Sequence, residues 1–167
     1  MIAQPRNALD VRERQLIHDL YPSLRRFAAV VGPAEVEPDD LVQEALFRMI
    51  RRGPLTDVTF PTAYLKRCIV NLSKDHTRSF VRRRRALMVL AATSEAFTEA
   101  YLSDVVEWMN LPPQARAILY MRELEGRTFG EIGEIVGCSE KAARNFAARA
   151  RKRLRKILSE EEHNATA

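Results

Sequence analysis

Basic side chains are the residues of this sequence most suited to bind another molecule, and they are concentrated in two separate stretches. Residues 61–88 carry a net charge of +7 and residues 140–158 carry a further +7, on a chain of 167 residues whose net charge is +5. The basic stretches are separated by residues of net charge −5, which indicates a polyanion that is contacted at two places. The chemistry that these residue types support is the binding of phosphates and bases.

The second basic stretch predicts a helix with one apolar side and one cationic side. Residues 140–156 hold eight basic residues and one acidic residue. On a helical wheel the side opposite the apolar residues carries Lys141, Arg144, Asn145, Arg149 and Lys152. A short helix expected in "TFGEIGEIVG", a tight turn and an N-cap at Ser139 complete the pattern of a helix-turn-helix. Arginine and asparagine can read base edges in the major groove, so we predict that this helix binds DNA. A solvated basic face on a terminal helix is the alternative.

A helix predicted to begin at Pro61 and to end near Arg82 carries a second polar row beside its buried stripe. The row consists of Tyr64, Arg67, Asn71, Lys74, Asp75 and Arg78, and of these Tyr64, Arg67, Asn71, Lys74 and Arg78 are the candidate binding residues. An aromatic ring, an amide and several cations in line are suited to unpaired bases and their phosphates. Tyr64 could instead cap the edge of the core, and this alternative concerns that residue alone.

The helix predicted to begin at Pro38 and to end before Gly53 has a third unusual face. Its apolar positions are expected to point inward, and opposite them stand Asp40, Gln43, Glu44 and Phe47. Polar side chains around an exposed phenylalanine suggest a docking surface for another helix.

Apolar spacing of three and four continues along nearly the whole chain, which predicts an all-α fold. Further helices are expected over 11–31 and between Pro113 and Gly126. Cys68 and Cys138 lie in apolar helical patterns and are expected to be reduced core residues. No cofactor is expected, and no metal site either, because the adjacent Asp75 and His76 lack a convergent third ligand.

Composition excludes other classes of protein. At 46% hydrophobic residues the sequence can form a core. No stretch approaches the roughly 20 apolar residues of a membrane span. The N-terminus lacks the apolar centre of a signal peptide, so a cytoplasmic location is expected.

Three blocks resemble the small sigma factors of bacterial RNA polymerase, the ECF (extracytoplasmic function) group. "PDDLVQEALFRMIRR" is similar to their region-two helix that binds core polymerase, and "FPTAYLKRCIVNLSKDHTRS" to their segment that melts and reads the −10 element. The block that begins "LPPQARAILYMRELEG" and ends with the basic helix resembles region four, which reads the −35 element. The resemblance implies two helical domains, residues 1–88 and 107–167, joined by a flexible linker over residues 89–106.

The same resemblance implies roles for individual residues. Asp40, Gln43 and Glu44 match positions that grip the largest polymerase subunit. Tyr64 falls where the family usually has tryptophan at the upstream edge of the melted bubble, and Asn71 matches an asparagine of the −10 surface. The loop over residues 51–60 lies where the family captures a flipped base. The matches directed at the −35 groove are Arg144, Asn145 and Arg149.

Several positions of the basic helix depart from the family pattern. Ala142 replaces a common threonine, Phe146 stands where an arginine is frequent, and Ala148 stands where a larger side chain is frequent. With fewer groups that read bases, recognition of the −35 element is expected to depend more on phosphates and DNA shape.

The expected function is that of a promoter-specificity subunit without enzymatic activity. Its expected partners are bacterial core RNA polymerase, promoter DNA and an anti-sigma factor, with no insertion into a membrane. Two alternatives are a helix-turn-helix regulator that does not engage polymerase and a sigma-like decoy that occupies an anti-sigma factor. An enzyme that acts on nucleic acid is the last alternative.

Overall fold

The computed structural model describes residues 9–91 and 110–165. The N-terminal half holds α1 (Val11–Val31), α2 (Pro38–Ile50), the 3₁₀ turn η1 (Leu55–Asp57) and α3 (Pro61–Ala91). The C-terminal half holds α5 (Pro113–Glu123), α6 (Phe129–Val136) and α7 (Glu140–Ala165). The described residues contain helices and no strand, which confirms the all-α prediction. None of the helices in these ranges is long and apolar enough to cross a membrane.

The helices begin where the sequence predicts. Asp10 caps α1 and forms a capping box with Glu13, while Pro38, Pro61 and Pro113 each occupy a first helical position. At α7 the Ser139 hydroxyl accepts a hydrogen bond from the backbone N–H of Ala142 at 3.1 Å, which confirms the predicted N-cap.

The end of α3 differs from the prediction, because the helix continues past Arg82 to Ala91. Residues 83–91 contain neither proline nor glycine, and they are rich in arginine, alanine, leucine and methionine, which favour helix. The helix therefore enters the predicted linker, residues 89–106. The remainder of that linker prediction falls almost wholly on residues 92–109, which lie outside the described residues.

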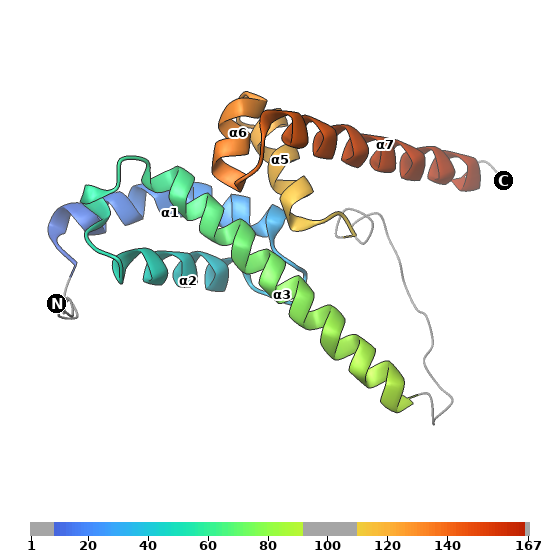
Figure 1. The fold of residues 1–167 in the computed structure, drawn as a ribbon, viewed down its shortest axis with the longest axis horizontal. Coiled ribbons are helices and arrows are strands. Elements are labelled where there is room, and N and C mark those ends of the chain that lie inside the picture. The colour runs from blue at the N-terminus through green and yellow to red at the C-terminus, as the bar shows by residue number, and fades with distance from the viewer. Residues whose placement is uncertain (1–8, 92–109, 166–167) are drawn as a thin grey trace.

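The helices α1 and α3 form a central layer, with α2 on one side and α5 and α6 on the other (Figure 1). Each helix turns its apolar stripe into one continuous core. The stripe members with no or almost no exposure include Leu24, Phe27, Val31, Leu41, Val42, Leu65, Ile69, Ile118 and Ile132. Leu16, Leu20, Ile50 and Cys68 pack at its edge and are half-buried.

The core also joins the two halves of the molecule. The rings of Phe27 in α1 and Tyr120 in α5 meet edge to face, with centroids 5.4 Å apart and planes at 80°. Close by, Arg116 of α5 is 1% exposed, and its Nη1 donates a hydrogen bond to the carbonyl oxygen of Gly32 at 2.9 Å. Burial lowers the pKa of Arg116 to about 10, so the guanidinium stays charged near neutral pH. The two halves therefore pack on each other through apolar and charged contacts.

Candidate nucleic-acid and protein interfaces

The four residues predicted to form a docking face on α2 all lie exposed on one side of that helix. Phe47 is 55% exposed, although it is large and apolar. The guanidinium of Arg51 lies 5.6 Å from the centre of its ring, and Arg48 Nε donates a hydrogen bond to Glu44 at 2.8 Å. Asp40 and Gln43 extend the exposed polar surface toward the start of α2. The face thus combines carboxylates with an apolar centre.

The start of α2 is fixed to α1 by the carboxylate of Asp39. The hydroxyl of Tyr21 donates to Asp39 Oδ1 at 2.7 Å, and Arg25 Nε lies 3.1 Å from both carboxylate oxygens. The Tyr21 hydrogen bond and then Arg25 hold the pKa of Asp39 below its ordinary value. The docking face therefore has a fixed orientation relative to α1.

The loop between α2 and α3 is held by a buried glutamate. Glu13 of α1 has no exposed surface, and its Oε1 accepts a hydrogen bond from the backbone N–H of Leu55 at 2.9 Å. Its other oxygen accepts from the backbone N–H of Asp10 at 3.0 Å. One carboxylate thus connects the start of α1 with η1, inside the loop that the resemblance assigns to base capture. The capping-box spacing of Asp10 and Glu13 was a signal for the first contact, but nothing local indicates the second.

Two hollows open beside this loop. One has a volume of about 210 Å³ and is lined by Met49, Arg52, Gly53, Pro54, Asp57, Val58 and Tyr64. The other, of about 430 Å³, is lined by Arg48, Arg51, Arg52, Tyr64, Cys68 and Asn71. Tyr64 and Arg52 line both, and the Arg52 guanidinium lies 5.6 Å from the centre of the Tyr64 ring. The two hollows offer stacking planes and positive charge together.

Tyr64 is half-buried, so part of its ring belongs to the edge of the core. Burial raises the pKa of Tyr64, and Cys68 one turn further along α3 raises it as well. Burial also raises the pKa of Cys68, a free thiol that is half-buried. The structure therefore supports parts of both interpretations of Tyr64, because the ring packs against the core and also borders a hollow.

The other members of the α3 row, Arg67, Asn71, Lys74 and Arg78, follow the same side of the helix. Arg67, Asn71 and Arg78 are exposed, and Lys74 is half-buried. Beyond them the run Arg82–Arg85 is exposed on the part of α3 that extends away from the other described helices (Figure 1). The exposed cations between Arg67 and Arg85 therefore form a basic surface along one long helix.

The predicted helix-turn-helix is present in α6 and α7. Gly137 has φ of +75°, a left-handed conformation that ends α6 and that glycine adopts without strain. Gly133 lies so close to the turn that an added Cβ would be 2.5 Å from the carbonyl oxygen of Cys138. These two glycines let α7 leave the turn close against α6.

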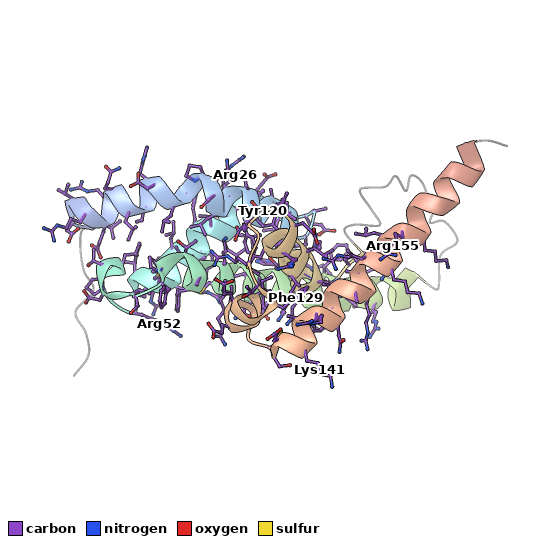
Figure 2. All side chains as sticks on the ribbon, turned by 90° about the horizontal axis from the view of Figure 1, so that it is seen from above. Arg26, Arg52, Tyr120, Phe129, Lys141 and Arg155 are labelled. Carbon is purple, nitrogen blue, oxygen red and sulfur yellow. The ribbon has the colours of Figure 1, made fainter. Side chains whose placement is uncertain are left out.

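The five predicted DNA-binding residues of α7, Lys141, Arg144, Asn145, Arg149 and Lys152, are all exposed. The opposite side packs into the core through Ala143, Ala147 and Ala150, which are buried. Phe146 is half-buried and packs against the core beside them. Figure 2 shows Lys141 near the start of α7 and Arg155 far along the same helix, so basic side chains occur along much of its length.

Within this row Arg144 is held by neighbouring side chains. Its guanidinium pairs with Glu140 one turn earlier, and it lies 5.5 Å from the centre of the Phe129 ring. The guanidinium of Arg122 in α5 lies 5.0 Å from the same ring. Phe129 therefore contacts cations from two helices, and one of them, Arg144, is a candidate for reading a base. The sequence interpretation did not identify this contact of Phe129.

Comparison with known proteins gives these surfaces a context. Residues 16–85 match Sigma-70 region 2, and residues 109–154 match Sigma-70, region 4. The ECF RNA polymerase sigma factor SigJ of Mycobacterium tuberculosis is 32% identical over 143 residues. That match covers 76% of this chain and 44% of SigJ, so the chain spans less than half the length of this relative.

The fold is similar to that of a sigma factor of known structure. RpoE of Bartonella quintana, solved in complex with the anti-sigma factor NepR, gives a TM-score of 0.57 at 19% sequence identity. The similarity covers 87% of this chain and 96% of RpoE. The region-2 match contains α2 and the polar row of α3, and the region-4 match contains α5, α6 and the first half of α7. With both regions present in order, the chain belongs to the sigma-70 family, in its ECF group.

Proposed function

We propose that the protein is a sigma factor that binds bacterial core RNA polymerase through α2 and directs it to promoters. The proposal is carried by one observation: three exposed faces that packing does not explain lie within the two matched sigma-70 regions. The α2 face, with Asp40, Gln43, Glu44 and Phe47, is the proposed contact with polymerase. The exposed phenyl ring of Phe47, surrounded by polar side chains, is suited to contact a helix of a partner protein.

The rows on α3 and α7 are the proposed promoter contacts. The α3 row, with the hollows beside Tyr64 and Arg52, takes the unpaired bases of the −10 element during melting. The start of α7 enters the major groove at the −35 element, with Arg144 and Asn145 closest to the bases. Residues 1–88 and 107–167 are the proposed units of −10 and −35 recognition, and neither carries out chemistry.

An anti-sigma factor is a further proposed partner. RpoE, whose fold this chain shares, was solved bound to such a factor. The exposed α2 face and the basic helices are surfaces that a protein partner could cover, which would keep the sigma factor from polymerase and from DNA.

Run-off transcription with purified bacterial core polymerase on a genomic promoter library tests the proposal. We expect specific transcripts that appear only when this protein is added, and that are lost with the double variant Asp40→Ala, Gln43→Ala. The matched control is Asp19→Ala with Gln15→Ala, which removes the same two side-chain types from an exposed part of α1.

The outcome separates the alternatives. If this protein binds promoters and core polymerase does not change that binding, a helix-turn-helix regulator that does not engage polymerase is favoured. If it binds an anti-sigma factor but gives no promoter-specific transcripts, a sigma-like decoy is favoured. Equal transcription by the α2 variant and its control would contradict the assignment of the docking face.

A further inference from the structure

Several cations of the described residues join one helix to another. Lys66 of α3 is 2% exposed, and its ammonium pairs with the carboxylate of Glu125, just after α5. Arg151 of α7 pairs with Glu123 at the end of α5. Arg144 is different, because its side chain is 64% exposed and lies on the face of α7 that is proposed to enter the major groove. The contacts that restrain such a side chain therefore affect how it meets DNA more than they affect the core.

The aromatic ring that contacts Arg144 is held in place by the start of α6. Phe129 is the first residue of α6, directly after the N-cap Thr128, whose side chain accepts a hydrogen bond from the backbone N–H of Glu131. The Glu131 carboxylate accepts in return from the backbone N–H of Thr128 at 2.8 Å. The Phe129 side chain is half-buried, so it packs against the core and is still open to other side chains. The capping box thus gives the ring a fixed place beside the start of α7.

A second guanidinium restrains the same ring. Arg122 of α5 lies 5.0 Å from the centre of the Phe129 ring, and its Nη1 donates a hydrogen bond to the carbonyl oxygen of Arg127 at 2.9 Å. Arg122 is half-buried and is anchored to the backbone by this bond. The Phe129 ring is therefore restrained by α5 as well as by its own helix, and it forms a fixed support for Arg144.

The Arg144 guanidinium makes two contacts that leave donors available for a base. It lies over the Phe129 ring, with Cζ 5.5 Å from the ring centre, and its Nη2 pairs with the Glu140 carboxylate one turn earlier. A guanidinium is planar and carries five N–H donors around its edge. The contact with the ring is not a hydrogen bond from this edge, and one carboxylate uses only some of the donors. Enough remain for the two acceptors of a guanine, O6 and N7.

We propose that Phe129 is a positioning residue for the −35 element, and that its ring holds the Arg144 guanidinium in the orientation that reads one base, with guanine as the expected base. An arginine side chain that is ordered only on binding costs conformational entropy. Ordering it beforehand avoids part of that cost, and only for the base that the fixed orientation fits. This inference rests on the proposed function, because it concerns how the same face of α7 distinguishes sequences. Phe129 contacts no base and acts through Arg144.

The variants separate the aromatic face from the apolar volume. Phe129→Leu removes the face and keeps an apolar side chain at the start of α6, whereas Phe129→Tyr keeps the face. Phe129→Met is a second apolar variant, so that the result does not depend on how leucine fits. The matched control is Phe146→Leu, which makes the same change at another half-buried phenylalanine that packs against the core.

The contact is measured first in the full chain, without DNA or polymerase. Protons that lie over an aromatic ring resonate at higher field, so the side-chain protons of Arg144 report on Phe129 in an NMR spectrum of arginine-labelled protein, assigned with Arg144→Ala. We expect these signals to move toward ordinary arginine positions in Phe129→Leu and Phe129→Met, and to stay in place in Phe146→Leu. Unchanged signals in Phe129→Leu would overturn the positioning contact, whatever the protein does with DNA.

The effect on reading is measured with the holoenzyme, full chain plus core polymerase, on promoters with a randomised −35 element. We expect Phe129→Leu to reduce the preference by about 2- to 5-fold at the position that Arg144→Ala relaxes, as the strength of an exposed cation–π contact implies. Preferences at the other positions and the salt slope should stay near wild type. Phe129→Tyr and Phe146→Leu should keep the preference. In the Arg144→Ala background, Phe129→Leu should cause no further loss, because the ring acts through that arginine.

Other outcomes contradict a stated part. An even loss of affinity for every −35 sequence in Phe129→Leu would show that the ring only stabilises α6. A loss of preference that persists in the Arg144→Ala background would show that Phe129 acts independently of the arginine. Retention of the wild-type preference by Arg144→Ala would overturn the proposed −35 recognition and this inference with it. The NMR result distinguishes that case from absence of the contact.

Discussion

Glu13 accepts hydrogen bonds from two backbone N–H groups that are 45 residues apart, those of Asp10 and Leu55. A carboxylate without exposed surface is unfavourable unless its oxygens are bonded, and here both are. The result is that α1 fixes the position of η1. The carboxylate of Glu13 therefore ties the loop beside the two hollows to the start of α1, in addition to the burial of Leu55 in the core.

Replacement of Glu13 by alanine is expected to destabilise this loop more than the helices. The N–H of Leu55 would lose its partner, at a cost of about 1–3 kcal/mol for a buried unsatisfied group. Urea unfolding measures the loss, and hydrogen exchange at residues 51–60 locates it. Glu13→Gln keeps an oxygen for the Leu55 N–H and should lose less. Equal losses in both variants would mean that the charge, and not the hydrogen bond to Leu55, is what matters.

Tyr64 is expected to act in melting, with Arg52 beside it. A stacked base is worth roughly 1–3 kcal/mol, and this contact is available only after bases are unpaired. Tyr64→Ala should therefore reduce open-complex formation on duplex promoters, and the defect should shrink on a pre-melted bubble. Because the ring is also half-buried, thermal unfolding must be measured in parallel, with Tyr64→Phe as the control. An equal defect on both templates would leave Tyr64 with a packing role alone.

At the scale of the element, α7 shows how one helix can combine two kinds of contact. Its apolar side is made mostly of alanine, and the small Ala143, Ala147 and Ala150 let the helix lie close to its neighbours. Its other side begins with Lys141, includes Arg144, which is held by Glu140 and Phe129, and continues with cations whose side chains are exposed. A straight helix contacts bases at its start and the DNA backbone further along.

The variants Arg144→Ala and Lys152→Ala should therefore differ in kind. Arg144→Ala is expected to cost about 1–3 kcal/mol and to relax the sequence preference at one −35 position. Lys152→Ala should weaken binding to all promoters alike and lower the salt slope by about one unit. Both effects are measured by the binding of each variant to a randomised −35 library at two salt concentrations. Retention of the wild-type preference by Arg144→Ala would mean that α7 contacts phosphates only.

Most elements could be predicted from the sequence because their signals are local. Pro38, Pro61 and Pro113 mark helix starts, and apolar spacing gives the buried stripe of each helix, as it does for Leu65, Ile69 and Leu72. The candidate binding faces could then be identified as the helix positions that do not belong to the buried stripes. The burial of Lys66 could not be predicted, because it depends on Glu125, which is 59 residues away along the chain. The hydrogen bond from Arg116 to Gly32 and the contact of Phe129 with Arg144 could not be predicted either, because their partners are also distant along the chain.

At the scale of the whole molecule, the two halves share an interior. Residues from both belong to one hydrophobic cluster, and the edge-to-face pair of Phe27 and Tyr120 lies at their junction. Such an aromatic pair contributes about 0.5–1.5 kcal/mol beyond the area that it buries. The described halves should therefore unfold as one cooperative unit, although the sequence resemblance implies two domains.

Tyr120→Ala is expected to make the two halves unfold in separate transitions. Without the ring, α5 loses a contact with α1, so α5–α7 should open at a lower urea concentration than α1–α3. Hydrogen exchange by mass spectrometry, followed on peptides of each half across a urea series, measures the two midpoints separately. Tyr120→Phe keeps the ring pair and should behave as wild type. Coincident midpoints in all three proteins would contradict a junction that depends on this pair.

The shared interior also has a consequence for the folding of the protein during its synthesis on the ribosome. Lys66 leaves the ribosome 59 residues before Glu125, an interval of roughly 3 to 12 seconds at about 5–20 residues per second. During that interval α1–α3 can fold, while Phe27 and Lys66 still lack the helices that will cover them. Each nascent chain therefore passes through a stage in which the face of α3 is uncovered, and a molecule that recognises that face has its first access during translation.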